Sequence, residues 1–229
     1  VFFAWKAAKF EDRKLNFWEA GKDTVRHDKV LEVMNKKRFA GFRVELAHVS
    51  GDEKILREIW KVKVHADTGY IDLTSEQSCA TESPVTIERF HYGGMAIRGS
   101  RQWFKDAHTS AGKGALKDEF ISPCRMLTNE GLTQADGNHS QPDWVCMTGP
   151  IDSAPVSVTL IPHPTNFRHP QHVRLHPEMP YFCFIPTVLT PFTIEPEKPL
   201  VSRYRIITGD GPVDTAEHDA MQKAFALEK

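Results

Sequence analysis

Two neighbouring stretches, "FRVELAHV" (residues 42–49) and "EIWKVKVH" (residues 58–65), decide the fold of this chain. In the first, mostly apolar residues at even positions alternate with Arg43 and Glu45. In the second, Trp60 begins an apolar series that alternates with lysines. A repeat of two residues is the signature of a β-strand with one buried face. Both stretches are therefore predicted to be strands, separated by the turn signal "SGDE".

Similar segments recur along the whole chain, and short turn signals such as "DTG" and "GDG" separate them. The further predicted strands are "YIDLT" (70–74), "VTIERFHY" (85–92), "MAIRG" (95–99), "DWVCM" (143–147), "VSVTLI" (156–161), "YFCFI" (181–185) and "LVSRYRIIT" (200–208). A parallel sheet would need long helical crossovers between these strands. The pattern instead predicts an all-β fold, a large antiparallel β-sandwich in one domain over residues 1–229.

Three other segments complete the predicted organisation. Residues 213–229 have helical spacing of apolar residues and are expected to form a short C-terminal helix that covers one sheet. Residues 106–143 are polar and glycine-bearing, and we expect a long excursion between strands, which is often functional. The opening "VFFAWKAAKF" reads as a strand already under way, so the first strands are expected to be missing.

Composition excludes several classes of partner and site. Lys and Arg number 29 and Asp and Glu number 30, so no bulk charge favours nucleic acid or an anionic membrane. No apolar run approaches the roughly 20 residues that cross a bilayer, and no membrane span is expected. Four cysteines lack CxxC spacing, which predicts buried free thiols rather than a zinc ribbon. No nucleophile-elbow, zincin or P-loop motif occurs, and no cofactor is predicted.

The run "IPHPTNFRHPQHVRLHP" (residues 161–177) concentrates histidine, arginine and proline. Strand parity places His172, Arg174 and His176 on one face, opposite the two apolar residues between them. His163 ends the preceding strand. Proline follows three of the histidines and holds the backbone before it extended. The run is therefore predicted to present its side chains rigidly.

Three interpretations of this run compete. A metal site is disfavoured, because His172 and His176 lie roughly 13 Å apart along a strand and Arg174 places a cation between them. A ligand site would use Arg168 and Arg174 as donors to carboxylates or sugar hydroxyls, with histidine as acid or base. In the purely structural alternative, the arginines bridge strands and the histidines bind loop carbonyls.

A second candidate region is "ERFHYGGMAIRGSRQW" (residues 88–103). Gly93 and Gly94 interrupt the alternation, as a β-bulge or a close backbone approach does. Arg98 shares a face with Ala96 and is predicted to form a structural ion pair or to anchor a ligand. Near the opening, three aromatic side chains are able to stack on a sugar ring, although such residues usually fill a core. They are Trp5, Phe17 and Trp18.

Four segments in order, "NFWEAGK", "YGGMAIRG", "IPHPTNFRHPQHVR" and "SRYRIITGDG", resemble the bacterial PmoA-like family, which is labelled "methane oxygenase". The most specific part is the HPxNxRxP pattern of residues 163–170. Family members carry an Asp-His-x-His-His-Arg-Gly block before the strand that corresponds to "VFFAW", and this block is absent here. The resemblance implies a galactose mutarotase-like supersandwich that is periplasmic or secreted. Methane oxidation is not expected, because the particulate enzyme is a membrane assembly.

These observations predict a carbohydrate-active or carbohydrate-binding protein whose partner is a small molecule or an oligosaccharide. The predicted catalytic residues are His163 and His172, and the predicted ligand-binding residues are Arg98, Asn166, Arg168 and Arg174. Acid/base chemistry on a sugar would also need a carboxylate from another strand, for which the candidates are Glu82, Glu88, Asp143 and Asp152. The alternatives are a non-catalytic carbohydrate-binding module and a His-bound metal oxidoreductase. Substrate, catalysis and oligomeric state are left open.

Overall fold

The computed structural model describes residues 1–19, 21–104, 124–211 and 213–228. Of the excursion predicted over residues 106–143, the part up to residue 123 lies outside the described residues. The remainder contains one short strand, β10 (Arg125–Thr128), followed by turns. No helix among the described residues is long and apolar enough to cross a membrane.

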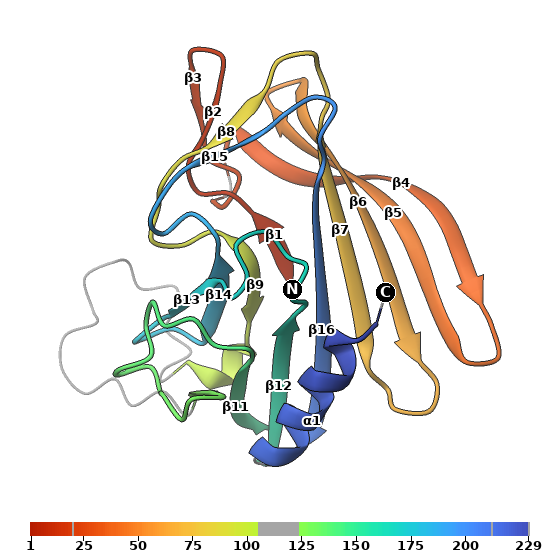
Figure 1. Ribbon diagram of the computed structural model, residues 1–229, viewed down its shortest axis with the longest axis vertical. Helices are drawn as coiled ribbons and strands as arrows, with labels where there is room; N and C mark the ends of the chain where they lie inside the picture. Colours follow the sequence, from red (N-terminus) through yellow and green to blue (C-terminus); the bar gives the residue numbers. More distant parts are fainter. Residues whose placement is uncertain (20, 105–123, 212, 229) are drawn as a thin grey trace.

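Eight antiparallel strands form the large sheet, in the order β10-β11-β12-β16-β7-β6-β5-β4 (Figure 1). Besides β10, they are β4 (Asp23–Asn35), β5 (Phe39–Ser50), β6 (Glu53–His65), β7 (Ile71–Cys79), β11 (Val145–Ile151), β12 (Ala154–Pro162) and β16 (Leu200–Asp210). Strands β5 and β6 are the two stretches whose alternation predicted the fold, and they pair directly with each other.

Two four-stranded antiparallel sheets face the large sheet. The small sheet has the order β1-β9-β14-β13, with β1 (Phe2–Ala4), β9 (Gly94–Arg98), β13 (His172–Leu175) and β14 (Tyr181–Ile185). The upper sheet, at the top of Figure 1, has the order β15-β8-β2-β3, with β2 (Ala8–Phe10), β3 (Arg13–Leu15), β8 (Val85–Ile87) and β15 (Phe192–Ile194). The described residues also form two helical segments, η1 (Arg101–Trp103) and α1 (Thr215–Ala226).

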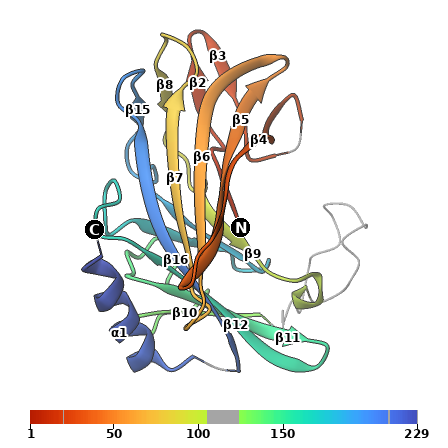
Figure 2. The same ribbon diagram turned by 90° about the vertical axis from the view of Figure 1, so that its right-hand side faces the viewer.

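The main core lies between the large sheet and the two smaller sheets. Phe182 and Phe184 of β14 and Tyr204 of β16 are all buried in it. On the other face of the large sheet, Phe225 of α1 packs against a second cluster that includes Trp144. Figure 2 shows α1 against the lower end of the molecule, near the C-terminus. The predicted all-β sandwich with a short C-terminal helix is thus confirmed.

The course of the chain around the two glycines explains where one strand prediction was wrong. "VTIERFHY" was predicted as a strand throughout, but β8 ends at Ile87 and the following residues turn away. Gly93 and Gly94 both have positive φ, which glycine adopts without strain. A Cβ on Gly94 would lie 2.3 Å from the Phe184 carbonyl oxygen. The predicted close backbone approach is therefore confirmed, and it brings β9 against β14.

None of the four cysteines, all of which lie in the described part of the chain, forms a disulfide, and Cys124, Cys146 and Cys183 are buried as predicted, whereas Cys79 is half-buried. Burial raises the pKa of the Cys183 thiol to about 12. It raises the pKa of Cys146 to about 11. These thiols are therefore protonated packing groups at neutral pH.

Candidate functional site

The small sheet has two chemically different faces. Val173 and Leu175 of β13 point into the main core. Strand geometry places His172 and Arg174 on the opposite face, as the sequence parity predicted. On β14, Phe182 also faces the main core, while its neighbours belong to a separate outer cluster. The outer face of this sheet therefore carries the polar residues that the sequence singled out.

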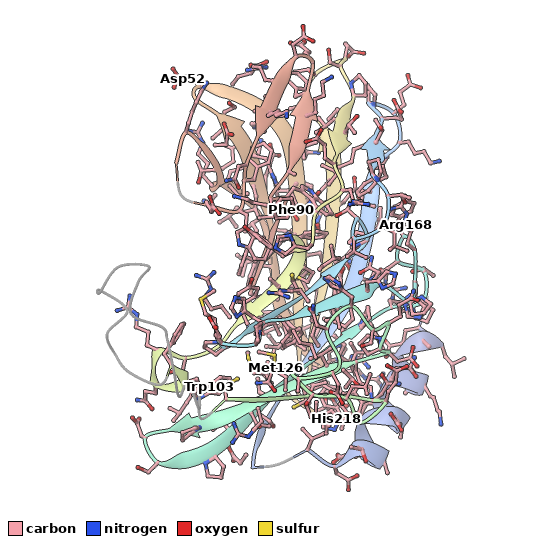
Figure 3. The ribbon with its side chains drawn as sticks, turned by 90° about the vertical axis from the view of Figure 1, so that its left-hand side faces the viewer. Asp52, Phe90, Trp103, Met126, Arg168 and His218 are labelled. Carbon is pink, nitrogen blue, oxygen red and sulfur yellow. The ribbon has the colours of Figure 1, made fainter. Side chains whose placement is uncertain are left out.

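Strand register arranges the outer face in rows. Phe2, Ala96, Cys183 and Arg174 are direct neighbours across β1, β9, β14 and β13. Small side chains thus occupy the middle of this row and large ones its ends. We call the outer surface of the small sheet, with the side chains that lie over it, the arginine face. Figure 3 looks toward this side of the molecule, with Phe90, which precedes β9, near the centre of the view.

Two guanidinium groups flank the ring of Tyr181. Arg98 is the direct cross-strand neighbour of Tyr181, and its Cζ lies 5.7 Å from the ring centroid. The Cζ of Arg98 is also 5.8 Å from the ring of Phe2. Burial raises the pKa of Tyr181 to about 12, and the charge and hydrogen bonding of Arg174 oppose that rise. Register and strand spacing separate the two arginine backbones by roughly 12 Å, and their long side chains converge on this tyrosine.

Neither arginine is neutralised by a carboxylate in the described part of the chain. Arg174 also has a buried Nε without a hydrogen-bond partner. Arg205 of the large sheet shows the usual structural arrangement instead. Its Nε and Nη2 donate to Asp72 at 2.7 and 2.9 Å, and Nη2 also binds Glu228. The arginine face therefore carries positive charge that a ligand carboxylate would balance.

Three histidines at this face have a lowered pKa: His91, His139 and His176. Burial, followed by the charges of Arg174 and Arg98, lowers the pKa of His176 to about 4. Burial and Arg174 also lower the pKa of His91. The pKa of His139 is lowered mainly by burial, with a further contribution from Arg174. Uncharged imidazoles are able to donate or accept hydrogen bonds, so the positive charge of the face comes from its arginines.

His172 has a defined tautomer. Its Nδ1 lies 2.8 Å from the carbonyl oxygen of His139, and a carbonyl only accepts, so Nδ1 carries the proton. The Nε2 of the neutral ring is then a hydrogen-bond acceptor. His172 also lines a small cavity of about 180 Å³ together with Gln141 and Arg168. It is the predicted catalytic residue that lies on the strand bearing Arg174.

Aromatic rings border the arginine face along β1. The ring of Trp18 lies 4.8 Å from Phe2, 5.2 Å from Tyr92 and 6.1 Å from Tyr181, measured between centroids. Of the three aromatics that sequence analysis considered for sugar stacking, Trp5 and Phe17 are buried in the main core. Trp18 is half-buried, so part of its ring remains exposed at the edge of the arginine face.

The carboxylate beside this aromatic border is Glu19, which the sequence analysis did not name. The Tyr92 hydroxyl lies 3.4 Å from Glu19 Oε1, and Lys6 Nζ donates to the same oxygen at 2.6 Å. None of the four carboxylates proposed earlier pairs with Arg98 or Arg174; Asp143 lies 3.7 Å from His169, and Asp152 binds Gln102. Glu19 directly follows Trp18 in "NFWEAGK", one of the four segments on which the family resemblance rests. That segment therefore contained a sequence signal for this carboxylate.

His163 and Asn166 lie elsewhere, beside the end of α1. His163 Nδ1 is 2.8 Å from Thr165 Oγ1, and its Nε2 is 3.0 Å from the Glu228 carbonyl oxygen. Asn166 pairs with the backbone of Arg203, accepting from its N–H at 2.7 Å and donating to its carbonyl at 2.8 Å. Both side chains are buried. The structure therefore does not bring them together with Arg98 and Arg174.

Arg168 is engaged by backbone carbonyls. Its Nη1 donates to Pro186 and Thr190, each at 2.6 Å, and its Nη2 donates to Pro191 at 2.9 Å. Figure 3 shows Arg168 toward one edge of the view, away from Phe90. Its guanidinium holds the loop after β14, so its role is structural, although it binds loop carbonyls where the structural alternative had arginines bridging strands. Within the described residues, no group of three or more His, Cys, Asp or Glu side chains is arranged to hold a metal ion.

Comparison with solved structures finds carbohydrate-active enzymes at low similarity. The chain is similar to the alpha-N-acetylgalactosaminidase NagBb from Bifidobacterium bifidum, with 14% identity, a TM-score of 0.42 and coverage of 96% of this chain and 33% of that one. It is also similar to the GH36 alpha-galactosidase AgaB from Geobacillus stearothermophilus, with 6% identity and a TM-score of 0.48, and the match covers 90% of this chain and 30% of that one. The match to the heparan sulfate lyase HepC from Pedobacter heparinus has 8% identity and a TM-score of 0.39, and it covers 91% of this chain and 24% of that one.

The chain thus spans a third or less of the length of these structures, and at these TM-scores the likeness carries no argument about its activity. No curated protein matches the chain. One family description, "Family of unknown function (DUF6807)", matches residues 1–223. Because that match covers nearly the whole sequence, the chain belongs to the DUF6807 family.

Proposed function

We propose that the protein binds a carbohydrate that carries a carboxylate, and that the arginine face is its binding site. The observation that carries this proposal is the pair Arg98 and Arg174. Both arginines flank Tyr181 on one sheet face, and neither has a carboxylate partner among the described residues. A guanidinium matches a carboxylate with two parallel hydrogen bonds.

The surroundings of the arginines fit a sugar ring better than a bare anion. Trp18 packs against Tyr92 and against Phe2, and the ring of Phe2 lies 5.8 Å from the Cζ of Arg98, so ring faces and edges continue outward from that guanidinium. Rings of this kind pack against the apolar face of a sugar, and the Tyr92 hydroxyl adds a polar contact. The neutral His91 and His139 supply further hydrogen-bonding groups without adding charge.

Isothermal titration calorimetry tests this proposal with glucuronate and galacturonate as ligands, and with glucose and inorganic phosphate as comparisons. We expect the uronates to bind and the comparison ligands to bind at least about tenfold more weakly. Arg174→Gln should remove uronate binding, whereas Arg43→Gln, on β5 of the large sheet, should not change it. Equal binding of phosphate and uronates, or of both variants and the wild type, would overturn the proposal.

A second candidate function, acid/base turnover of the bound sugar acid, is favoured by the geometry of His172. The carbonyl of His139 fixes its Nδ1 as donor and leaves Nε2 to accept a proton. His172→Gln should then keep uronate binding and lose turnover, measured by NMR as interconversion or cleavage of the sugar. Unchanged turnover in this variant would remove His172 from the chemistry and leave binding as the function.

We also keep two expectations from the sequence as proposals. The resemblance to the PmoA-like family is supported by the HPxNxRxP pattern of residues 163–170, and we propose that it reflects common descent. Because this resemblance implies it, we also propose that the protein is periplasmic or secreted. Immunoblots of periplasmic, cytoplasmic and secreted fractions of the native host test the location directly.

A further inference from the structure

A cleft of about 360 Å³ opens between β1 and the part of the large sheet formed by β4, β5 and β6. Its lining is mostly aromatic and aliphatic, with polar groups at few positions. The residues that matter for the argument are Phe2, Trp18, Leu46, Trp60, Arg26 and His27. Ligand sites are commonly apolar clefts of about 300–1,000 Å³ with a few polar groups. This cleft is at the small end of that range.

The cleft and the arginine face share a wall. Phe2 lines the cleft, and its ring centroid is 5.8 Å from the Cζ of Arg98. Trp18 also lines the cleft, and its ring lies 6.1 Å from Tyr181. A ligand that extends from the arginine face across β1 therefore passes from Arg98 over these two rings into the cleft.

The floor of the cleft is held rigidly from below. Trp60 Nε1 donates to Glu58 Oε1 at 2.6 Å, and Glu58 is fully buried. The same carboxylate also binds His48 at 2.7 Å and the hydroxyl of Ser75. A side chain fixed by a buried network presents one surface and loses little conformational entropy when a ligand packs on it. Trp60 is thus a preorganised ring platform.

We propose that this cleft binds a second sugar unit, so that the ligand is an acidic disaccharide or the end of an acidic oligosaccharide. The inference rests on the function proposed above and specifies its substrate class. The carboxylate-bearing sugar lies on the arginine face, and the next ring packs against Trp60 and Trp18. His27 lies on the exposed edge strand β4, opposite Leu46 and on the same sheet face as Trp60, and it faces the hydroxyl groups of that second ring.

Calorimetry with galacturonate and 4-linked digalacturonate tests the inference. We expect the disaccharide to bind at least about tenfold more tightly than the monosaccharide. His27→Trp, which fills the cleft from an exposed position, should abolish this advantage and leave monosaccharide binding unchanged. Trp60→Phe, which removes the indole N–H and shortens the platform, should reduce the advantage. Arg43→Gln is the matched control and should retain it.

The outcomes separate the two proposals. If neither saccharide binds, the proposed function fails, and this inference fails with it. If both bind with equal affinity, or if His27→Trp retains the tenfold advantage, the second subsite is overturned while the arginine face stands. An aryl glucuronide that gains affinity through the cleft where the disaccharide does not would show an apolar aglycone site and would likewise overturn the sugar subsite.

Discussion

The loop from His163 to Pro170 and the arginine face contain the same types of side chain but use them differently. In the loop, Asn166 makes two hydrogen bonds to the backbone of Arg203, and Arg168 donates to three carbonyls. On the arginine face, Arg174 has a buried Nε without a hydrogen-bond partner and forms no ion pair with a carboxylate of the described residues. Polar groups whose partners are all within the chain stabilise the fold, whereas an arginine without a carboxylate partner keeps a charge that a ligand carboxylate is able to balance.

The largest expected effect is a loss of stability when Asn166 in the loop is replaced. Asn166→Ala removes the partner of the Arg203 N–H, and such a loss costs about 1–3 kcal/mol. It also removes one of the two donors to the Arg203 carbonyl, which keeps the N–H of His163 at 3.0 Å. We expect the free energy of unfolding to fall by about 2–4 kcal/mol, measured by urea denaturation. Asn35→Ala, at an exposed position in β4, is the matched control and should change it by less than about 0.5 kcal/mol. Equal effects of the two substitutions would contradict the structural role of the loop.

The next effect is a loss of stability in mild acid, caused by His176 on the arginine face. Burial and the nearby arginines lower its pKa to about 4 in the folded protein, from the ordinary histidine value of 6.5. As the pH falls from 6.5 toward 4, the unfolded chain binds a proton that the folded chain does not, so stability decreases; below pH 4 the loss levels off. At pH 5 the His176 contribution amounts to at most about 2 kcal/mol.

Urea denaturation of the wild type and His176→Asn at pH 7 and pH 5 measures this contribution. In the wild type, the backbone N–H of Met179 donates to Nδ1 of His176 at 2.9 Å. The side-chain oxygen of asparagine is able to accept the same hydrogen bond. The variant should lose less stability between the two pH values than the wild type. An identical loss in both proteins would show that the pKa of His176 is not lowered in the folded protein.

Substitution of Arg174 should separate stability from binding. Because its guanidinium has no carboxylate partner in the described part of the chain, Arg174→Gln should change the free energy of unfolding by less than about 1 kcal/mol. Uronate affinity should nevertheless fall more than about tenfold, which corresponds to ~1.4 kcal/mol. A large loss of stability together with unchanged affinity would reverse the comparison and make Arg174 a structural residue.

The sequence predicted the fold well because alternation reports directly which face of a strand is buried. The same rule correctly placed Arg174 opposite Val173 and Leu175, and Arg98 beside Ala96. It did not detect β4, since this edge strand is exposed over most of its length and shows little alternation of burial. Alternation fails wherever neither face of a strand is covered.

The alternation of residues along a strand could not show which histidines and arginines would have hydrogen-bond partners within the chain. The partners of His163 come from Thr165 and from Glu228, which is 65 residues away in the sequence. The ring contacts of Trp18 likewise depend on Tyr92 and Tyr181. These distances follow from the packing of the sheets and leave no periodic trace in the sequence. Sequence reasoning therefore identified the residue types of the site but not its members.

The smallest expected effect distinguishes the two arginines from each other. Arg98 is exposed, and its contacts with Phe2 and Tyr181 are cation–π contacts, worth about 0.5–1 kcal/mol at such sites. Arg98→Gln should therefore lower the free energy of unfolding by no more than about 1 kcal/mol. As an exposed charge at the rim, Arg98 should mainly accelerate association, so the variant should bind more slowly and with weaker salt dependence.

Stopped-flow fluorescence of Trp18 and its neighbours at two salt concentrations measures those association rates, with Arg43→Gln as control. Arg98 also lines a separate cavity of about 580 Å³ that includes Trp103 and Asp210. If Arg98→Gln weakened equilibrium binding more than Arg174→Gln, the carboxylate would be anchored at Arg98 and the ligand would extend toward that cavity. A purely kinetic effect of Arg98 keeps the anchor at Arg174, where the guanidinium is partly buried and its Nε unpartnered.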